Sequence, residues 1–217
     1  GTNSGGSAGS INRIQMTHIP TLGNAIDFGD CVSRQLVAGV SSVTRSVIMG
    51  GESPSAVIDT MDSFEHASLG NAADFGNLSG VRRNMNGGGG NSTRGICAGG
   101  NTPSLVDIIE YITFTTAGNA TDFGNLGAAA EGVGTCSGGT RTVHGGGNSG
   151  SEQNVIEYIT TASTGNATDF GDLTDARRTI PASSLLRAVF MGGYSPGRIN
   201  IIDYVTIAST GDAADFG

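Results

Sequence analysis

The sequence contains no lysine and no tryptophan, and all eleven of its basic residues are arginine. With 19 acidic residues, the 217-residue chain has a formal net charge of −8. An acidic, lysine-free surface is poorly suited to neutralising phosphate groups, so no nucleic acid partner is expected. The absence of lysine also excludes Schiff-base catalysis and the phosphate-binding lysine of Walker-type loops.

Long apolar runs and cysteine are scarce too. No stretch approaches the roughly 20 apolar residues of a membrane-spanning helix, so no membrane insertion is expected. The three cysteines, Cys31, Cys97 and Cys136, are odd in number and lack metal-binding spacing. They are therefore expected to be small buried hydrophobic residues. The start of the sequence shows no signal-peptide pattern. It lacks an initiator methionine and opens with a flexible run at residues 1–6, which suggests a processed or excerpted piece of a longer polypeptide.

Glycine is abundant, with 37 residues. No strict every-third-residue pattern indicates collagen, and recurring apolar runs argue against disorder. Many tight turns are the remaining explanation. Residues 1–11 are predicted to be a flexible start rich in glycine and serine, and residues 12–217 a single repeat array.

An internal repeat of about 47 residues organises the chain. The tripeptide Asp-Phe-Gly occurs five times, each time after a Gly-Asn-Ala or Gly-Asp-Ala turn. A second landmark, an arginine separated by four residues from a pair of glycines, recurs at nearly the same spacing as the first. The tripeptides begin at Asp27, Asp74, Asp122, Asp169 and Asp215, and the arginines of the second landmark are Arg45, Arg94, Arg141 and Arg187.

Each unit has room for four short strands. In the last unit these are a polar stretch at 177–180, an apolar strand at 186–191, a β-branched and aromatic strand at 201–207, and a short strand carrying phenylalanine. Four strands of about five residues with their turns are typical of a propeller blade. The sequence therefore predicts an all-β propeller, with about four to five blades in this chain.

The recurring side chains suggest structural roles. The phenylalanine of each Asp-Phe-Gly is predicted to wedge between neighbouring blades, and the glycine pair to end a strand where φ is positive. The recurring arginine is predicted to pair with a carboxylate, either that of Asp-Phe-Gly or the acidic residue of the third strand. The predicted wedges are Phe28, Phe75, Phe123, Phe170 and Phe216.

The arginine, the glycine pair and an acidic-aromatic strand such as Glu157-Tyr158 together resemble the kelch motif, with Phe170 and its equivalents in place of the usual tryptophan. Units such as residues 154–178 more closely resemble kelch-like repeats of virion and tail proteins of marine bacteriophages, especially cyanophages. This resemblance implies a component of a phage particle, at its extracellular side. It implies other virion proteins and a host-surface glycan or protein as partners, and leaves homo-oligomerisation open.

The units are unevenly represented. Five copies of the third-and-fourth-strand half are present, but only four copies of the other half. Missing sequence that completes a larger ring, strands from another chain, and an open array all remain compatible with this count.

The sequence offers no catalytic, cofactor or metal site. The kinase motif Asp-Phe-Gly recurs here without a kinase lysine or catalytic loop, which indicates a structural turn. The three histidines share no repeat position or metal spacing. Calcium bound by Asn119, Thr121 and Asp122 is a minor alternative.

Function is therefore expected where the units differ, in the loops after the glycine pairs. Tyr194 and Arg198 are the best candidates for exposed contacts, followed by Arg82 and Arg83. The favoured function is a non-enzymatic virion module, a tail or fibre component that displays loops for host recognition or docking. The alternatives are a propeller-class enzyme, either an oxidase or a glycan-active protein, and a purely structural capsid or tail decoration.

Overall fold

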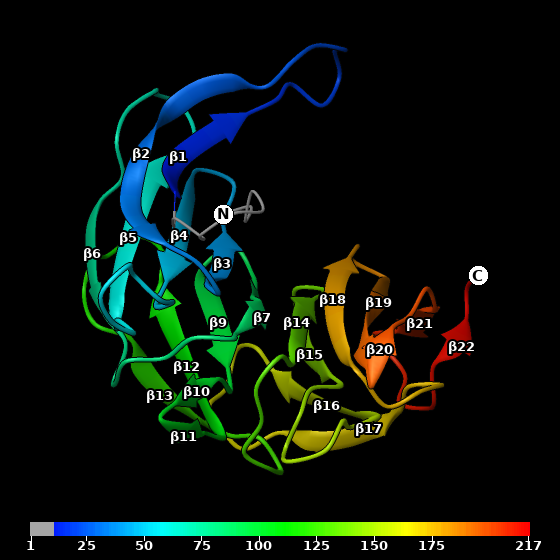
Figure 1. Cartoon of the computed structure of the whole chain (residues 1–217). Coiled ribbons are helices and arrows are strands. Elements are labelled where there is room, and N and C mark those ends of the chain that lie inside the picture. Colours follow the sequence, from blue (N-terminus) through cyan, green and yellow to red (C-terminus); the bar gives the residue numbers. More distant parts are fainter. Residues whose placement is uncertain (1–10) are drawn as a thin grey trace.

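The structure, a computed structural model, describes residues 11–217 and confirms the all-β prediction (Figure 1). It contains four blades in a propeller arrangement, each built on four antiparallel strands that follow chain order. A fifth short strand joins two of the sheets: residues 86–87 pair in parallel with the first strand of the third blade, and residues 197–198 pair with the second strand of the fourth. Within residues 11–217 no helix occurs that is long and apolar enough to cross a membrane.

Blade I consists of β3 (Ala38–Ser41), β4 (Arg45–Met49), β5 (Thr60–Glu65) and β6 (Ala73–Asn77). Blade II consists of β8 (Gly89–Gly90), β9 (Arg94–Ala98), β12 (Ile108–Thr113) and β13 (Thr121–Asn125). Blade III consists of β14 (Gly134–Ser137), β15 (Arg141–Gly145), β16 (Val155–Thr160) and β17 (Thr168–Asp172). Blade IV consists of β18 (Arg178–Ser183), β19 (Arg187–Ser195), β21 (Ile202–Thr206) and β22 (Ala214–Asp215). The remaining strands are β1 (Ile11–Met16), β2 (Ile26–Arg34), β7 (Asn86–Gly87), β10 (Asn101–Thr102), β11 (Ser104–Leu105) and β20 (Gly197–Arg198).

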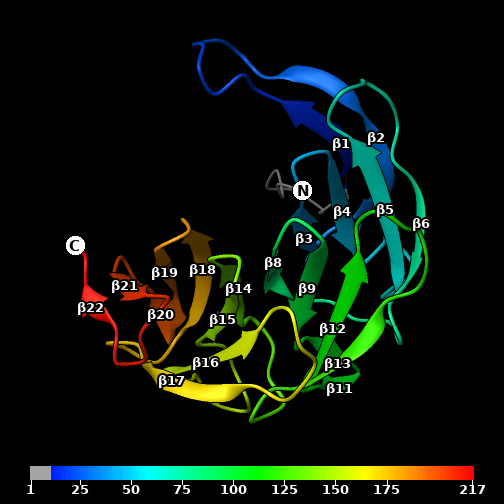
Figure 2. The ribbon, with the colours of Figure 1, turned by 180° about the vertical axis from the view of Figure 1, so that it is seen from behind.

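The blades follow one another along an incomplete ring (Figures 1 and 2). Their first strands lie toward the centre and their fourth strands at the outside. A separate hairpin, β1–β2, precedes blade I. It is the fifth copy of the third-and-fourth-strand half of the repeat. Among the described strands, this hairpin and β22 do not pair with each other. Of the predicted flexible start, residues 1–10 lie outside the described residues, and Ile11 opens β1.

Phenylalanines of the Asp-Phe-Gly tripeptides join successive blades. Phe75 at the end of blade I is buried in one apolar cluster with Cys97 and Ile112 of blade II. Phe123 and Phe170 lie in equivalent clusters with the blades that follow them. Burial of each ring contributes roughly 1.5–3 kcal/mol, which a single thin sheet cannot provide alone.

The first and last of these phenylalanines lie differently. Phe28 of the β1–β2 hairpin is buried against Phe64 of blade I, with ring centroids 5.2 Å apart. Phe216 is 58% exposed and contacts Tyr204 of its own blade, with centroids 5.6 Å apart. Phe216 therefore does not lie between two blades of this chain, because no further blade follows it here.

The recurring turn before Asp-Phe-Gly also links the blades. The Gly118 amide donates to the carbonyl of Phe75, and the Asn119 side chain accepts from the Asn77 amide. This close approach requires glycine at Gly76, where φ is +141° and a Cβ would lie 2.4 Å from the Gly118 oxygen. The other blade junctions repeat the backbone contact, which explains why both tripeptide and turn recur.

The glycine pairs adopt the predicted positive φ in all four blades. They follow the second strand in blades I, II and III. In blade IV, however, the prediction that the pair ends the strand is wrong, because β19 continues through Gly192 and Gly193 to Ser195. This extension pairs with β18 and with the short strand β20.

Candidate functional site

A buried arginine–carboxylate pair serves three of the four blades. The arginine precedes the first strand of the blade, and the carboxylate lies on its third strand. In blade IV, Arg177 Nη2 lies 2.9 Å from Asp203 Oδ2, and both side chains are fully buried. The pairs of blades I and II are equally enclosed; they are Arg34 with Asp62 and Arg82 with Glu110.

Blade II shows how such a pair is completed. Arg82 Nη1 donates to the carbonyl oxygens of Gly99 at 3.2 Å and Ile108 at 3.1 Å. The Ser79 amide donates to the Glu110 carboxylate at 2.8 Å. Blade I repeats both carbonyl contacts, and blades I and IV repeat the amide contact. The cage therefore gives a guanidinium one carboxylate and two carbonyls.

Blade III lacks the arginine. Arg82 and Arg177 stand eight positions after the aspartate of Asp-Phe-Gly, and Ala130 occupies that position in the third unit. The third-strand carboxylate, Glu157, keeps its backbone donor, since the Gly127 amide lies 2.9 and 3.2 Å from its two oxygens. In the described part of the chain, Glu157 has no arginine partner, and it is half-buried where its three counterparts are buried.

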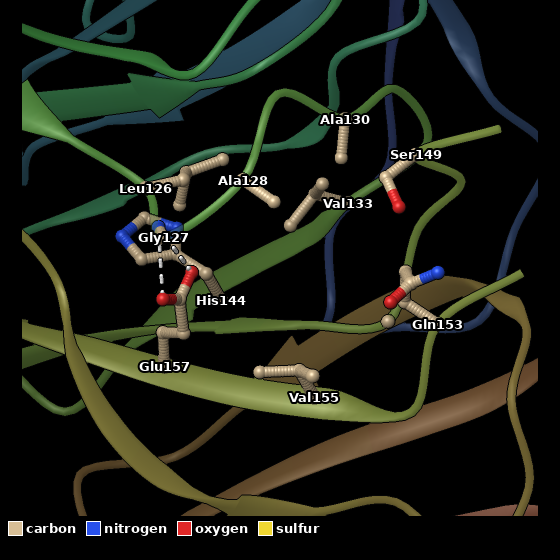
Figure 3. Close-up of a pocket in the computed structure, with 11 residues that line it drawn as sticks. Leu126, Gly127, Ala128, Ala130, Val133, His144, Ser149, Gln153, Val155 and Glu157 are labelled. Atoms are coloured by element: carbon tan, nitrogen blue, oxygen red, sulfur yellow. Dashed lines mark hydrogen bonds between the residues drawn. The ribbon is translucent and has the colours of Figure 1, made fainter. Parts of the chain in front are cut away.

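A cavity of about 230 Å³ lies at this place (Figure 3). Glu157 and His144 lie together at one side of it, beside the Gly127 backbone, and Ser149 and Gln153 lie at the other side. Its apolar lining is formed by Leu126, Ala128, Ala130, Val133 and Val155.

His144 is the second polar group of this pocket. It lies opposite Glu157 in the β15–β16 register, so both side chains leave the same face of the sheet. Its Nδ1 lies 3.0 Å from Thr135 Oγ1, while its buried Nε2 has no hydrogen-bond partner. Burial lowers the pKa of His144 to about 3, so the ring is neutral at physiological pH.

The electrostatics of Glu157 follow from the missing arginine. Burial is the largest influence and raises the pKa of Glu157, against the lowering effect of the Gly127 amide, while nearby Asp169 raises it further. The pocket therefore combines a carboxylate that lacks a cation with a neutral imidazole and apolar walls. Such a site is suited to binding a small ligand that bears hydrogen-bond donors.

The structure brings two of the predicted contact residues together elsewhere. Tyr194 and Arg198 are direct partners in the β19–β20 hairpin, and both are exposed. They do not line the pocket of blade III. The predicted loop after the third glycine pair does contribute, through Ser149.

Arg82 and Arg83 do not form an exposed contact surface. Arg82 is 1% exposed and belongs to the buried pair described above, which is a correction to its predicted place in a recognition loop. Arg83 is half-buried, with Nη1 2.7 Å from Glu52 Oε1.

The prediction that the recurring arginines pair with the aspartate of Asp-Phe-Gly or with the repeated acidic residue of the third strand is also wrong. Arg45 does pair with a carboxylate of the third strand, but this is Glu65 and not the repeated Asp62. Their guanidinium groups lie over aromatic rings, as for Arg141 at 4.3 Å from the Tyr158 centroid. Those of the first three blades also donate to a carbonyl of the next blade, which for Arg141 is that of Ile207. A flat guanidinium stacks well on a ring and links blades without burying a carboxylate. Arg94 and Arg187 lie over the equivalent rings of Tyr111 and Tyr204, whereas Arg45 lies over Phe75.

No group of three or more histidine, cysteine or acidic residues suited to a metal occurs in residues 11–217. Cys97 and Cys136 are buried as predicted, Cys31 is half-buried, and all three are free thiols. Burial raises the pKa of Cys136 to about 12, which makes it an inert thiol at neutral pH.

Sequence reasoning missed the pocket, because it looked for landmarks that recur. The available signal was an interruption: aligned on Asp-Phe-Gly, two units place arginine where the third has Ala130, and the first unit places Arg34 one position earlier. Alignment on the recurring arginine places His144 where the other units have Ile48, Cys97 and Phe190.

Comparison with protein-family models gives no match for this chain, and comparison with curated proteins gives none either. The propeller arrangement thus rests on the structure itself, and the kelch and phage likeness on the sequence motifs alone.

Proposed function

We propose that this chain is a non-enzymatic binding module of a bacteriophage particle, in which rigid blades support one ligand pocket in blade III. The observation that carries the binding role is the replacement of the repeat's buried arginine by Ala130, which leaves Glu157 and His144 facing a cavity. A buried polar atom without a hydrogen-bond partner, such as His144 Nε2, costs free energy that a ligand with a suitable donor can recover. Most other buried charges of the repeat are paired within the architecture.

The setting on a phage particle, in a tail or fibre, derives from the resemblance of the repeat to kelch-like virion proteins. Under this proposal the partners are other virion proteins and a host-surface glycan or protein. The exposed pair Tyr194 and Arg198 is a second contact surface, because an aromatic ring beside a guanidinium is a common combination at recognition sites.

A propeller-class enzyme is the second candidate, and one observation favours it. Glu157 and His144 form a non-periodic pair of titratable groups in a pocket, as catalytic groups often do. The low pKa of His144, about 3, argues against it as a general base near neutral pH, which is why binding is preferred.

The test is a ligand screen on the purified chain. Ligand-observed NMR with a library of small cationic, anionic and neutral compounds, together with a glycan array, is run on the wild type and on Ala128→Leu. Ala128 is exposed at the pocket, so leucine there narrows the cavity without changing the core. Tyr194→Ala/Arg198→Ala serves as the matched variant for the hairpin surface.

We expect compounds that bind the wild type and are lost in Ala128→Leu. A screen without any compound sensitive to this variant would overturn the pocket as a binding site. Turnover of a compound by the wild type that Glu157→Gln abolishes would replace the binding module with the enzyme.

A further inference from the structure

We infer that the pocket of blade III binds a guanidinium group, supplied by a ligand in place of the arginine that the other blades carry in their own sequence. This inference rests on the proposed function of the pocket as a binding site and names the chemical class of its ligand.

The first argument is that the acceptors for a guanidinium are already arranged. In blade II the Arg82 guanidinium meets the Glu110 carboxylate and the carbonyl oxygens of Gly99 and Ile108. The residues at these three positions of blade III are Glu157, Gly146 and Val155, and all of them line the pocket. Blade III has the cage without its cation.

The second argument is that the backbone of the cage is unchanged. The Gly99 amide donates to the Ile108 carbonyl at 3.0 Å, and the Gly146 amide donates to the Val155 carbonyl at 2.9 Å. The strand register that places Glu157 also matches that of Glu110. The loss of the arginine has therefore not collapsed the site around it.

Size and polarity form the third argument. A cavity of about 230 Å³ is below the roughly 300–1,000 Å³ of sites for drug-sized ligands, so it suits a small group or a single side chain. Leu126, Ala128 and Val133 provide an apolar wall along which methylene groups can lie, as the stem of arginine does. Gly127 and Ala128 are exposed and allow entry from solvent.

The unpartnered Nε2 of His144 adds to the cage. When Nδ1 carries the proton and donates to Thr135, Nε2 accepts a hydrogen bond from the ligand. A planar guanidinium, with five donors in a fixed fork, can reach a carboxylate and further acceptors at once, whereas an ammonium group is a compact, strongly hydrated charge. The site should therefore prefer guanidinium to ammonium.

The experiment is an NMR titration of the wild-type chain at low-millimolar ligand. The probes are methylguanidinium and L-arginine as free compounds, and the tripeptide Gly-Arg-Gly as an arginine side chain within a polypeptide. Propylammonium is the control for charge alone. The readout is the imidazole signal of His144, identified by its absence in His144→Gln.

We expect a saturable shift with methylguanidinium and a propylammonium affinity roughly tenfold or more lower. Glu157→Gln should weaken methylguanidinium binding by roughly tenfold or more, since a charged hydrogen bond is lost. Ala130→Arg should abolish binding, because the introduced guanidinium occupies the cage. Ala128→Leu provides a second block if Ala130→Arg does not fold.

Tighter binding of the tripeptide than of L-arginine would identify a partner polypeptide, and the reverse order a free compound.

Unchanged methylguanidinium binding in both Ala130→Arg and Ala128→Leu would overturn the inference, as would equal affinity for propylammonium. Compounds without a guanidinium that bind this pocket, while methylguanidinium does not, would overturn the inference but leave the binding module standing. Absence of any pocket ligand would overturn both.

Discussion

Blades II and III share one backbone plan but use it differently. In blade II, Glu110 is 1% exposed and lies against Arg82, with Cys97 beside the pair. In blade III the equivalent glutamate is half-buried, without an arginine, beside His144. In both blades a backbone amide of the preceding segment donates to the carboxylate.

The comparison teaches that the presence or absence of one arginine separates a filled cage from an open pocket in this repeat. An arginine in the segment before the blade closes the cage from inside, and an alanine leaves it open to solvent. Under the proposed function, one unit carries the ligand site while the neighbouring units keep the fold. The comparison can be tested by measuring how much the free energy of unfolding depends on each buried arginine.

The largest expected effect is that of Arg82→Ala. It leaves Glu110 as a buried carboxylate without a cation, and breaking a buried pair in this way destabilises a protein by about 3–5 kcal/mol. The free energy of unfolding, measured by urea denaturation, should fall by that amount.

Arg83→Ala is the matched control, because the neighbouring Arg83 pairs with Glu52 at partial exposure. Such a pair contributes about 1 kcal/mol or less. Equal losses of unfolding free energy for Arg82→Ala and Arg83→Ala would contradict the comparison. If Arg82→Ala does not fold, the double variant Arg82→Met/Glu110→Met should fold, since apolar replacement of both partners is often neutral.

The next effect concerns pH and His144. Its pKa of about 3 in the folded protein lies below the ordinary value of about 6.5 for histidine. The folded state therefore binds fewer protons than the unfolded state between these values. Stability is fully present above pH ~6.5 and is lost at roughly 1.4 kcal/mol per unit as pH falls.

Between pH 6.5 and 5, this amounts to about 2 kcal/mol. The measurement is the difference in unfolding free energy between wild type and His144→Gln, which cancels the contributions of the other titrating groups. Blade II, with Cys97 at this position, should contribute no such slope in that range. A difference that does not change with pH would show that His144 is solvated or partnered, which would remove one of the two polar groups from the pocket.

Much of the blade plan was predictable from the sequence. Phe75, Phe123 and Phe170 wedge between blades, and the turn at Gly118–Ala120 recurs because it hydrogen-bonds to the preceding blade. Both features act over one repeat length, so their spacing is visible in the chain. The half-unit count was also informative, since the surplus half is the β1–β2 hairpin.

The partners of the arginines were not predictable in the same way. Arg82 and Arg94 are both near-invariant features of the units, but only the three-dimensional register shows that the first meets Glu110 and the second the ring of Tyr111. The side chains of Glu110 and Tyr111 are adjacent on strand β12 and therefore face opposite sides of the sheet. Sequence spacing alone cannot assign each arginine to its face.

The smallest expected effect reverses sign between the two blades. The pKa of Glu157 in the folded protein is raised, mainly by burial. The carboxyl group therefore stabilises the folded state below its ordinary pKa of about 4.3, and this stabilisation is lost as pH rises through the raised pKa. Glu157→Gln should therefore make the protein slightly more stable than wild type at neutral pH, by less than about 1 kcal/mol given the partial exposure of the group. Glu110→Gln should destabilise it, because Arg82 then loses its buried counter-charge. Urea denaturation of both variants at pH 7 measures the two signs side by side. Destabilisation by both would mean that Glu157 has a cationic partner in the folded chain, and that the two blades are alike after all.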